Sequence, residues 1–119
     1  LEAATAPAAT PEDVVRAWFT AAARSAAAGN HRLATALAGV RLPDEVRTSL
    51  LEGHRQTSAP LHRAVTDMGV PDPDAALTLV TAAVNVCITQ VEAGAPPDLE
   101  ARRAAAFTLG GLTALASRT

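Results

Sequence analysis

Three histidines are the residues in this sequence best suited to bind a metal: His31, His54 and His62. Two ligands on one helix face stand three or four residues apart. His54 and His62 are eight residues apart, and Pro60 lies between them. His31 falls in the first turn of a short predicted helix, and no cluster of Cys, His and acidic residues has the spacing of a metal site. We therefore expect no metal and no other cofactor.

The candidates for nucleophilic or phosphate chemistry are isolated as well. Cys87 is the single cysteine and has no basic residue nearby, so we interpret it as a small buried apolar side chain. Gly110-Gly111 lacks the lysine and the preceding strand of a phosphate-binding loop. Acidic residues cluster only at predicted helix starts. A small helical enzyme would need a convergent set of perturbed titratable groups, so we expect no catalytic residue and no enzyme.

Length and composition set the class of protein. The 119 residues suit a single domain, and the net charge of −2 provides no basic surface for nucleic acid. Hydrophobic residues make up 49% of the chain, yet no segment has the character of a membrane span, and the N-terminus lacks a signal peptide. We expect a cytoplasmic protein with no membrane contact. Because Leu1 is not a natural start, we expect a fragment of a longer protein.

The sequence divides into predicted helices separated by turn residues, and no segment shows the alternation of apolar and polar residues that is typical of a strand. Residues 1–9 are rich in Ala, Thr and Pro and predict a linker or disordered end before one domain over 10–119. The expected fold is all-α, an antiparallel bundle of about five helices. These are predicted between Thr10 and Gly29, Asn30 and Gly39, Leu42 and Gly69, Asp72 and Gly94, and from about Leu99 to Ser117. Pro60 predicts a kink or brief break near 57–60.

The fourth and fifth predicted helices are apolar on more than one face. No charged residue lies between Asp74 and Glu92, and none lies between Arg103 and Arg118. One face of the fourth helix carries Leu77, Val80, Val84, Cys87 and Val91, and a second carries Ala76, Leu79, Ala83, Val86 and Gln90. A helix that is apolar all round is buried on more than one side.

We therefore predict that these two helices pack on their own domain and on a second subunit, as a four-helix interface of a homodimer. Gly110-Gly111 fits a close helix approach, which would offset a cost of about 1 kcal/mol for each glycine. The alternative is that Ala-rich helices look apolar by default. The predicted interface residues are Leu79, Ala83, Val86, Gln90, Phe107, Thr108, Gly111, Leu112 and Leu115.

Three segments carry a resemblance to a known family: 62–76, 80–85 and 109–112. The first is similar to the junction between the long pocket helix and the first dimerisation helix of actinobacterial TetR-family transcription regulators, and the others resemble that family's dimer helices. The resemblance covers 12–117. It implies the C-terminal effector-binding and dimerisation domain of a repressor. DNA would then be a partner only through a missing N-terminal helix-turn-helix domain of about fifty residues.

The resemblance also implies an effector pocket walled by the first four predicted helices. Its candidate lining is Trp18, Leu33, Leu37, Leu50, His54, Thr57, Leu61, Val84 and Ile88. With two Phe and no Tyr, an aromatic cage for a cation is not expected, so the effector would be a neutral or weakly acidic apolar small molecule. Alternatively, Trp18 packs in the core, and Asn85 or Gln90 forms hydrogen bonds across the dimer.

The expected mechanism is allosteric repression. An apolar effector would enter the bundle, shift the third predicted helix at Pro60, and change the separation of two DNA-binding domains. Such a change would release the parent protein from DNA. The alternative is a structural helical module that dimerises, or recruits a partner, without a small-molecule ligand. That alternative predicts a filled core.

Overall fold

The computed structural model describes residues 10–29 and 43–117, apart from the side chains at 46, 47 and 49–58. This part is entirely helical, which confirms the all-α prediction. It comprises α1 (Pro11–Ala27), α3 (Asp44–Asp67), α4 (Pro73–Glu92) and α5 (Pro97–Ala116). The described residues thus form four helices rather than five. The helix predicted between Asn30 and Gly39 lies outside them, together with His31, Leu33 and Leu37.

Local sequence signals explain where most of these helices begin and end. At α1 the Thr10 hydroxyl accepts a hydrogen bond from the Asp13 backbone N–H at 3.1 Å, and the Asp13 carboxylate accepts one from the Thr10 N–H at 3.5 Å. This reciprocal pair is a capping box. At α4 the Asp72 carboxylate accepts from Ala75 N–H at 3.1 Å. Gly69 and Gly94 follow α3 and α4 with φ of +81° and +113°, which favours glycine.

Two sequence predictions about the helices need correction. α5 begins at Pro97 and not at about Leu99, because proline suits the first helical position, and Asp98 lies in its first turn. The sequence predicts a kink or a brief break at Pro60; α3 runs without interruption through Pro60, so a break does not occur there, and the kink stays a prediction. A proline inside a helix removes one backbone hydrogen bond, and this 24-residue helix tolerates that loss.

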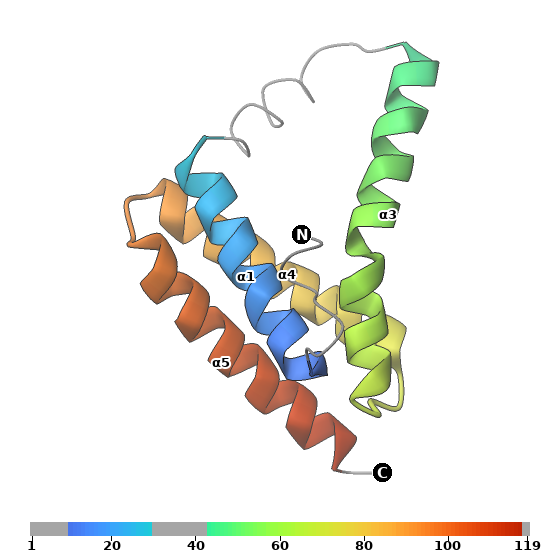
Figure 1. Ribbon diagram of the computed structural model, residues 1–119, viewed down its shortest axis with the longest axis vertical. Helices are drawn as coiled ribbons and strands as arrows, with labels where there is room; N and C mark the ends of the chain where they lie inside the picture. The colour runs from blue at the N-terminus through green and yellow to red at the C-terminus, as the bar shows by residue number, and fades with distance from the viewer. Residues whose placement is uncertain (1–9, 30–42, 118–119) are drawn as a thin grey trace.

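The core forms around α1, which packs against α3, α4 and α5 (Figure 1). α4 and α5 run antiparallel, joined by a short turn, and α1 covers one side of the pair. Val15, Phe19 and Ala23 of α1 are fully buried. Ala26 of α1 is buried as well, and the other buried apolar residues come from α3, α4, α5 and the turn after α3: Leu61, Ala64, Val65, Val70, Ala76, Val80, Val84, Cys87, Val91, Ala101, Ala105, Leu109 and Leu112.

The three faces of α4 have different surroundings. The core face holds Ala76 and most of the first predicted apolar face, although Leu77 is only half-buried. A second face carries the exposed apolar residues Leu79 and Val86. The third is an exposed polar stripe of Thr78, Thr81, Asn85 and Thr89. Because α1 covers the core face alone, the second apolar face lies open beside α5.

Candidate functional site: an apolar groove between α4 and α5

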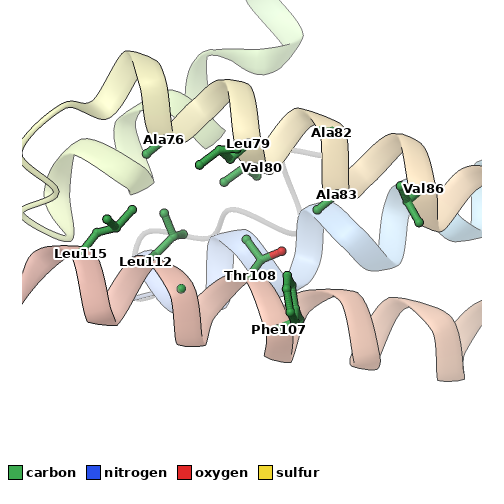
Figure 2. A pocket seen from close by; sticks show the side chains of 11 residues that line it. Ala76, Leu79, Val80, Ala82, Ala83, Val86, Phe107, Thr108, Leu112 and Leu115 are labelled. Atoms are coloured by element: carbon green, nitrogen blue, oxygen red, sulfur yellow. The ribbon is translucent and has the colours of Figure 1, made fainter.

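An apolar groove runs between α4 and α5 on the side away from α1. Its first hollow, along the middle of the two helices, has a volume of about 350 Å³. Figure 2 shows side chains of both helices directed into the space between them. The lining residues are Ala76, Leu79, Val80, Ala82, Ala83, Val86, Phe107, Thr108, Gly111, Leu112 and Leu115. None of these side chains carries a charge.

Large apolar side chains on the rim of this groove are exposed to solvent. Phe107 is 83% exposed, Leu79 66%, Val86 58% and Leu115 38%. Leaving a side chain of this size in water forgoes roughly 1.5–3 kcal/mol of burial free energy. Single exposed apolar residues are ordinary on protein surfaces, whereas a contiguous set typically marks an interaction site.

The floor of the groove belongs to the domain's own core. Leu112 is 3% exposed and Thr108 is 8% exposed. Among the described residues, the Thr108 Oγ1 is the buried side-chain oxygen without a hydrogen-bond partner. An unpaired buried hydroxyl costs about 1–3 kcal/mol of folding free energy. Thr108 therefore contributes less to the stability of the domain than the apolar residues around it.

A second hollow of about 380 Å³ continues the groove toward the start of α5. It shares Ala83, Val86 and Phe107 with the first hollow, so the two form one surface. Glu100 and Arg103 line its far end, where Arg103 Nη1 lies 3.7 Å from Glu100 Oε2. The centre of the groove is therefore uncharged. One end carries a positive and a negative side chain, and these two pair with each other.

Most of the predicted dimer-interface residues meet at this groove. Gln90 is exposed on α4 but lines neither hollow. The sequence did not predict Ala76, Val80 and Ala82 as lining residues, because the spacing of apolar residues along a helix does not distinguish a groove wall from a core face. The predicted residues that do line the hollow are Leu79, Ala83, Val86, Phe107, Thr108, Gly111, Leu112 and Leu115.

The predicted effector-pocket residues are only partly described. Leu61 and Val84 are buried in the core, while Trp18 and Ile88 are half-buried and pack against it. These four come from α1, α3 and α4, which pack pairwise against one another. Leu50, His54 and Thr57 belong to α3, but their side chains are outside the described part, as are Leu33 and Leu37 entirely.

Two single-residue candidates from the sequence can be placed directly. Cys87 is buried, and burial raises the pKa of its thiol, with the nearby Glu100 carboxylate adding to the effect. A thiol in this state is a weak nucleophile at neutral pH. His62 Nε2 lies 3.0 Å from Asp74 Oδ1, which links α3 to the first turn of α4. Within the described ranges, no three His, Cys, Asp or Glu side chains gather as a metal site would require.

α4 is the one helix in the described part of the chain whose length and composition would let it cross a membrane. The sequence predicted no such segment, and only 28% of this one is buried inside the domain. The polar side chains along its exposed face count against a membrane span. Thr78 and Thr89 donate their hydroxyl protons to the carbonyl oxygens of Asp74 and Asn85 at 3.1 and 2.9 Å. The exposed Asn85 amide has no such local partner among the hydrogen bonds described, and burying an amide in hydrocarbon costs several kcal/mol, roughly 4–8.

Comparisons with family models, with curated proteins and with solved structures gave no significant match. The groove geometry and the sequence resemblance are therefore the two observations on which a function can be argued.

Proposed function

We propose that this chain is a dimerisation domain that self-associates through the α4–α5 groove, and that it serves as the C-terminal regulatory domain of a TetR-type transcription repressor. The observation that carries the proposal is the contiguous apolar face formed by the groove, with Phe107, Leu79 and Val86 exposed. An identical face on a second copy would bury these side chains and close a four-helix interface.

The size of this face suits a specific dimer. α4 and α5 have 20 residues each. Two such helices side by side are about 30 Å long and about 20 Å wide, a footprint of roughly 600 Å² before side-chain relief is counted. Specific interfaces bury roughly 800 Å² per partner, so the two helices together provide a surface of the required order.

The charge pattern suits the same partner. The centre of the groove carries no charge, and Glu100 and Arg103 at its end pair with each other. Covering the groove with its own copy therefore buries no unpaired charge, which would otherwise be strongly destabilising. A nucleic acid would meet no cluster of basic side chains on this face.

The repressor role rests on the resemblance over helices α3 to α5. In this proposal the domain holds two DNA-binding domains at a fixed separation, and an apolar effector bound among α1, α3 and α4 alters that separation and releases the DNA. Trp18 and Ile88, both half-buried, would border the effector. The proposed location is the cytoplasm, and the domain would act without a cofactor.

One observation favours a second candidate, a structural dimerisation module without a ligand. The hollows described above lie on the α4–α5 face, whereas Leu61 and Val84 of the predicted effector pocket are buried in the core. If the core is filled and has no cavity for an effector, self-association is the function that this candidate assigns to the domain.

A fusion experiment tests whether the domain can supply the dimer that a repressor needs. The chain is joined to a helix-turn-helix domain that binds its palindromic operator only as a dimer. We expect repression of an operator-controlled reporter. Leu79→Glu should abolish repression, because it places a charge on the groove. Thr81→Glu, on the exposed polar stripe of the same helix, is the matched control and should retain it.

Absence of repression by the fusion, although the protein accumulates and is helical, would contradict the proposed function. Repression that survives Leu79→Glu would place the interface elsewhere. Adding a set of apolar compounds to the same reporter separates the two candidates, since the regulatory domain predicts induction by one of them and the structural module predicts none.

A further inference from the structure

Phe107 and Gly111 form a complementary pair on the open face of α5. They are one helical turn apart, and both line the groove. Phe107 is the most exposed large apolar side chain described, at 83%. Gly111 leaves the helix surface bare beside it, and a Cβ placed there would meet nothing within 4 Å.

Nothing in the described part of the chain explains the glycine at 111. Gly111 is helical, so it does not supply a turn, and no neighbour crowds it. Glycine in a helix interior costs about 1 kcal/mol relative to alanine. A close approach by another molecule at Gly111 would offset that cost. The exposed ring of Phe107 would likewise be stabilised by a surface that buries it.

Resting on the self-association proposed above, we propose that Phe107 of each copy seats on Gly111 of the other copy. In an antiparallel pair of α5 helices, a twofold axis that crosses the open face at the level of residue 109, midway along the helix between Phe107 and Gly111, brings each ring over the other copy's glycine. The contact then occurs twice and is isologous. A bare glycine lets the helix axes approach to about 8 Å, the short end of the usual range.

The self-complementary spacing identifies the occupant as a second copy. A projecting side chain and its matching hollow lie on the same face, four residues apart, so the face fits itself under a twofold rotation. An unrelated apolar partner could fill the hollow and contact Phe107, but nothing would require it to carry the matching projection and hollow at the same four-residue spacing. The uncharged centre of the groove and its footprint of roughly 600 Å² are consistent with the same occupant.

Gly111→Leu, with Gly110→Leu as the matched control, tests this pairing. Both glycines are helical and exposed, and a Cβ added at either would have no neighbour within 4 Å, but only Gly111 lines the groove. We expect both variants to stay as helical as the wild type by circular dichroism. Gly111→Leu should raise the dimer dissociation constant about a hundredfold, because two contacts are overfilled per dimer. Gly110→Leu should leave it unchanged.

Mixing variants tests the pairing between copies. Phe107→Ala removes the projecting ring and should weaken its homodimer at least about tenfold. When it is mixed with Gly111→Leu, one contact is the original ring on glycine and the other is leucine against alanine. Native mass spectrometry should therefore show the heterodimer in excess over both homodimers.

Three results would overturn the proposal, each in a distinguishable way. A wild-type dimer with no heterodimer preference, or one that tolerates Gly111→Leu as well as Gly110→Leu, would refute the pairing and leave the self-association intact. A wild type that is monomeric at all concentrations would refute both. A monomeric wild type that co-sediments with phosphatidylcholine vesicles would assign the face to a membrane.

Discussion

The guanidinium Nε of Arg24 lies 3.2 Å from Oδ1 of Asp98 and joins the last turn of α1 to the first turn of α5. Both side chains are about two-thirds exposed, so water and salt screen their attraction. The stability of the contact between these helices comes from the buried side chains of α1.

We therefore expect unequal effects from two substitutions on α1. Arg24→Ala should lower the free energy of unfolding by less than about 1 kcal/mol, as exposed ion pairs do. Phe19→Ala should lower it by about 3–5 kcal/mol, because Phe19 is fully buried and its removal leaves a cavity. Urea unfolding at one fixed protein concentration compares them. Equal losses would mean that α1 is held by its ends and not by its core face.

The capping box of α1 makes a prediction about pH. Hydrogen bonds from the Thr10 side chain, then from its backbone N–H, and the Arg16 guanidinium hold the pKa of Asp13 below its usual value of 3.8. A carboxyl with a lowered pKa in the folded state stabilises the fold above its unfolded pKa, and this contribution is lost as pH falls through the folded pKa. We expect the stability difference between wild type and Asp13→Asn to be present at pH 7 and to be lost as the pH falls below 3.8 and through the lowered folded pKa.

Titration of the Asp13 carboxyl by NMR checks the cause of that shift. In Thr10→Val, which keeps the side-chain shape but removes the hydroxyl, the pKa of Asp13 should rise toward its ordinary value. An unchanged pKa would show that Thr10 is not the main cause. A difference between wild type and Asp13→Asn that persists at low pH would contradict the linkage.

The buried thiol of Cys87 predicts slow alkylation. Burial raises its pKa and Glu100 raises it further, so little thiolate forms at neutral pH, and reagent reaches it only when the structure opens. If opening costs about 4 kcal/mol, iodoacetamide should react about a thousandfold more slowly with the folded chain than with the chain unfolded in urea. Equal rates would show that Cys87 is accessible in the folded state.

Trp18 reports on the proposed effector pocket, because it is the single tryptophan of the chain. We expect an apolar fluorophore such as anilinonaphthalene sulfonate to bind beside it and accept energy from the indole. Ile88→Phe, which would narrow the same region, should weaken binding of the fluorophore about tenfold, as measured by the concentration at which energy transfer appears. Transfer that is absent in the wild type would favour the structural module, and transfer insensitive to Ile88→Phe would place the fluorophore elsewhere.

Local signals made most of the fold predictable. Thr10 and Asp72 cap their helices, and Gly69 and Gly94 follow helix ends, because each of these features depends on a few neighbouring residues. The start of α5 was misjudged because Asp98 has the chemistry of a cap, whereas Pro97 has the stronger preference for the first helical position.

The division between core and groove was less predictable. Periodicity shows that α4 and α5 have two apolar faces, but it does not show which face α1 covers. Leu112 was assigned to the interface, yet it is buried in its own domain and forms the groove floor. Ala76, placed on the second apolar face, lines the groove and is also buried in the core. Both outcomes depend on the packing of α1, which the sequence of either helix alone does not encode.

Sedimentation equilibrium of the wild-type chain beside Leu79→Glu and Thr81→Glu tests the central claim, self-association through the α4–α5 groove, most directly. The chain has a mass of 12.1 kDa. We predict twice that mass for the wild type and for Thr81→Glu, and the single mass for Leu79→Glu with its helical content retained. A wild type that keeps the single mass up to about 1 mM, where association would contribute only about 4 kcal/mol, would contradict the account.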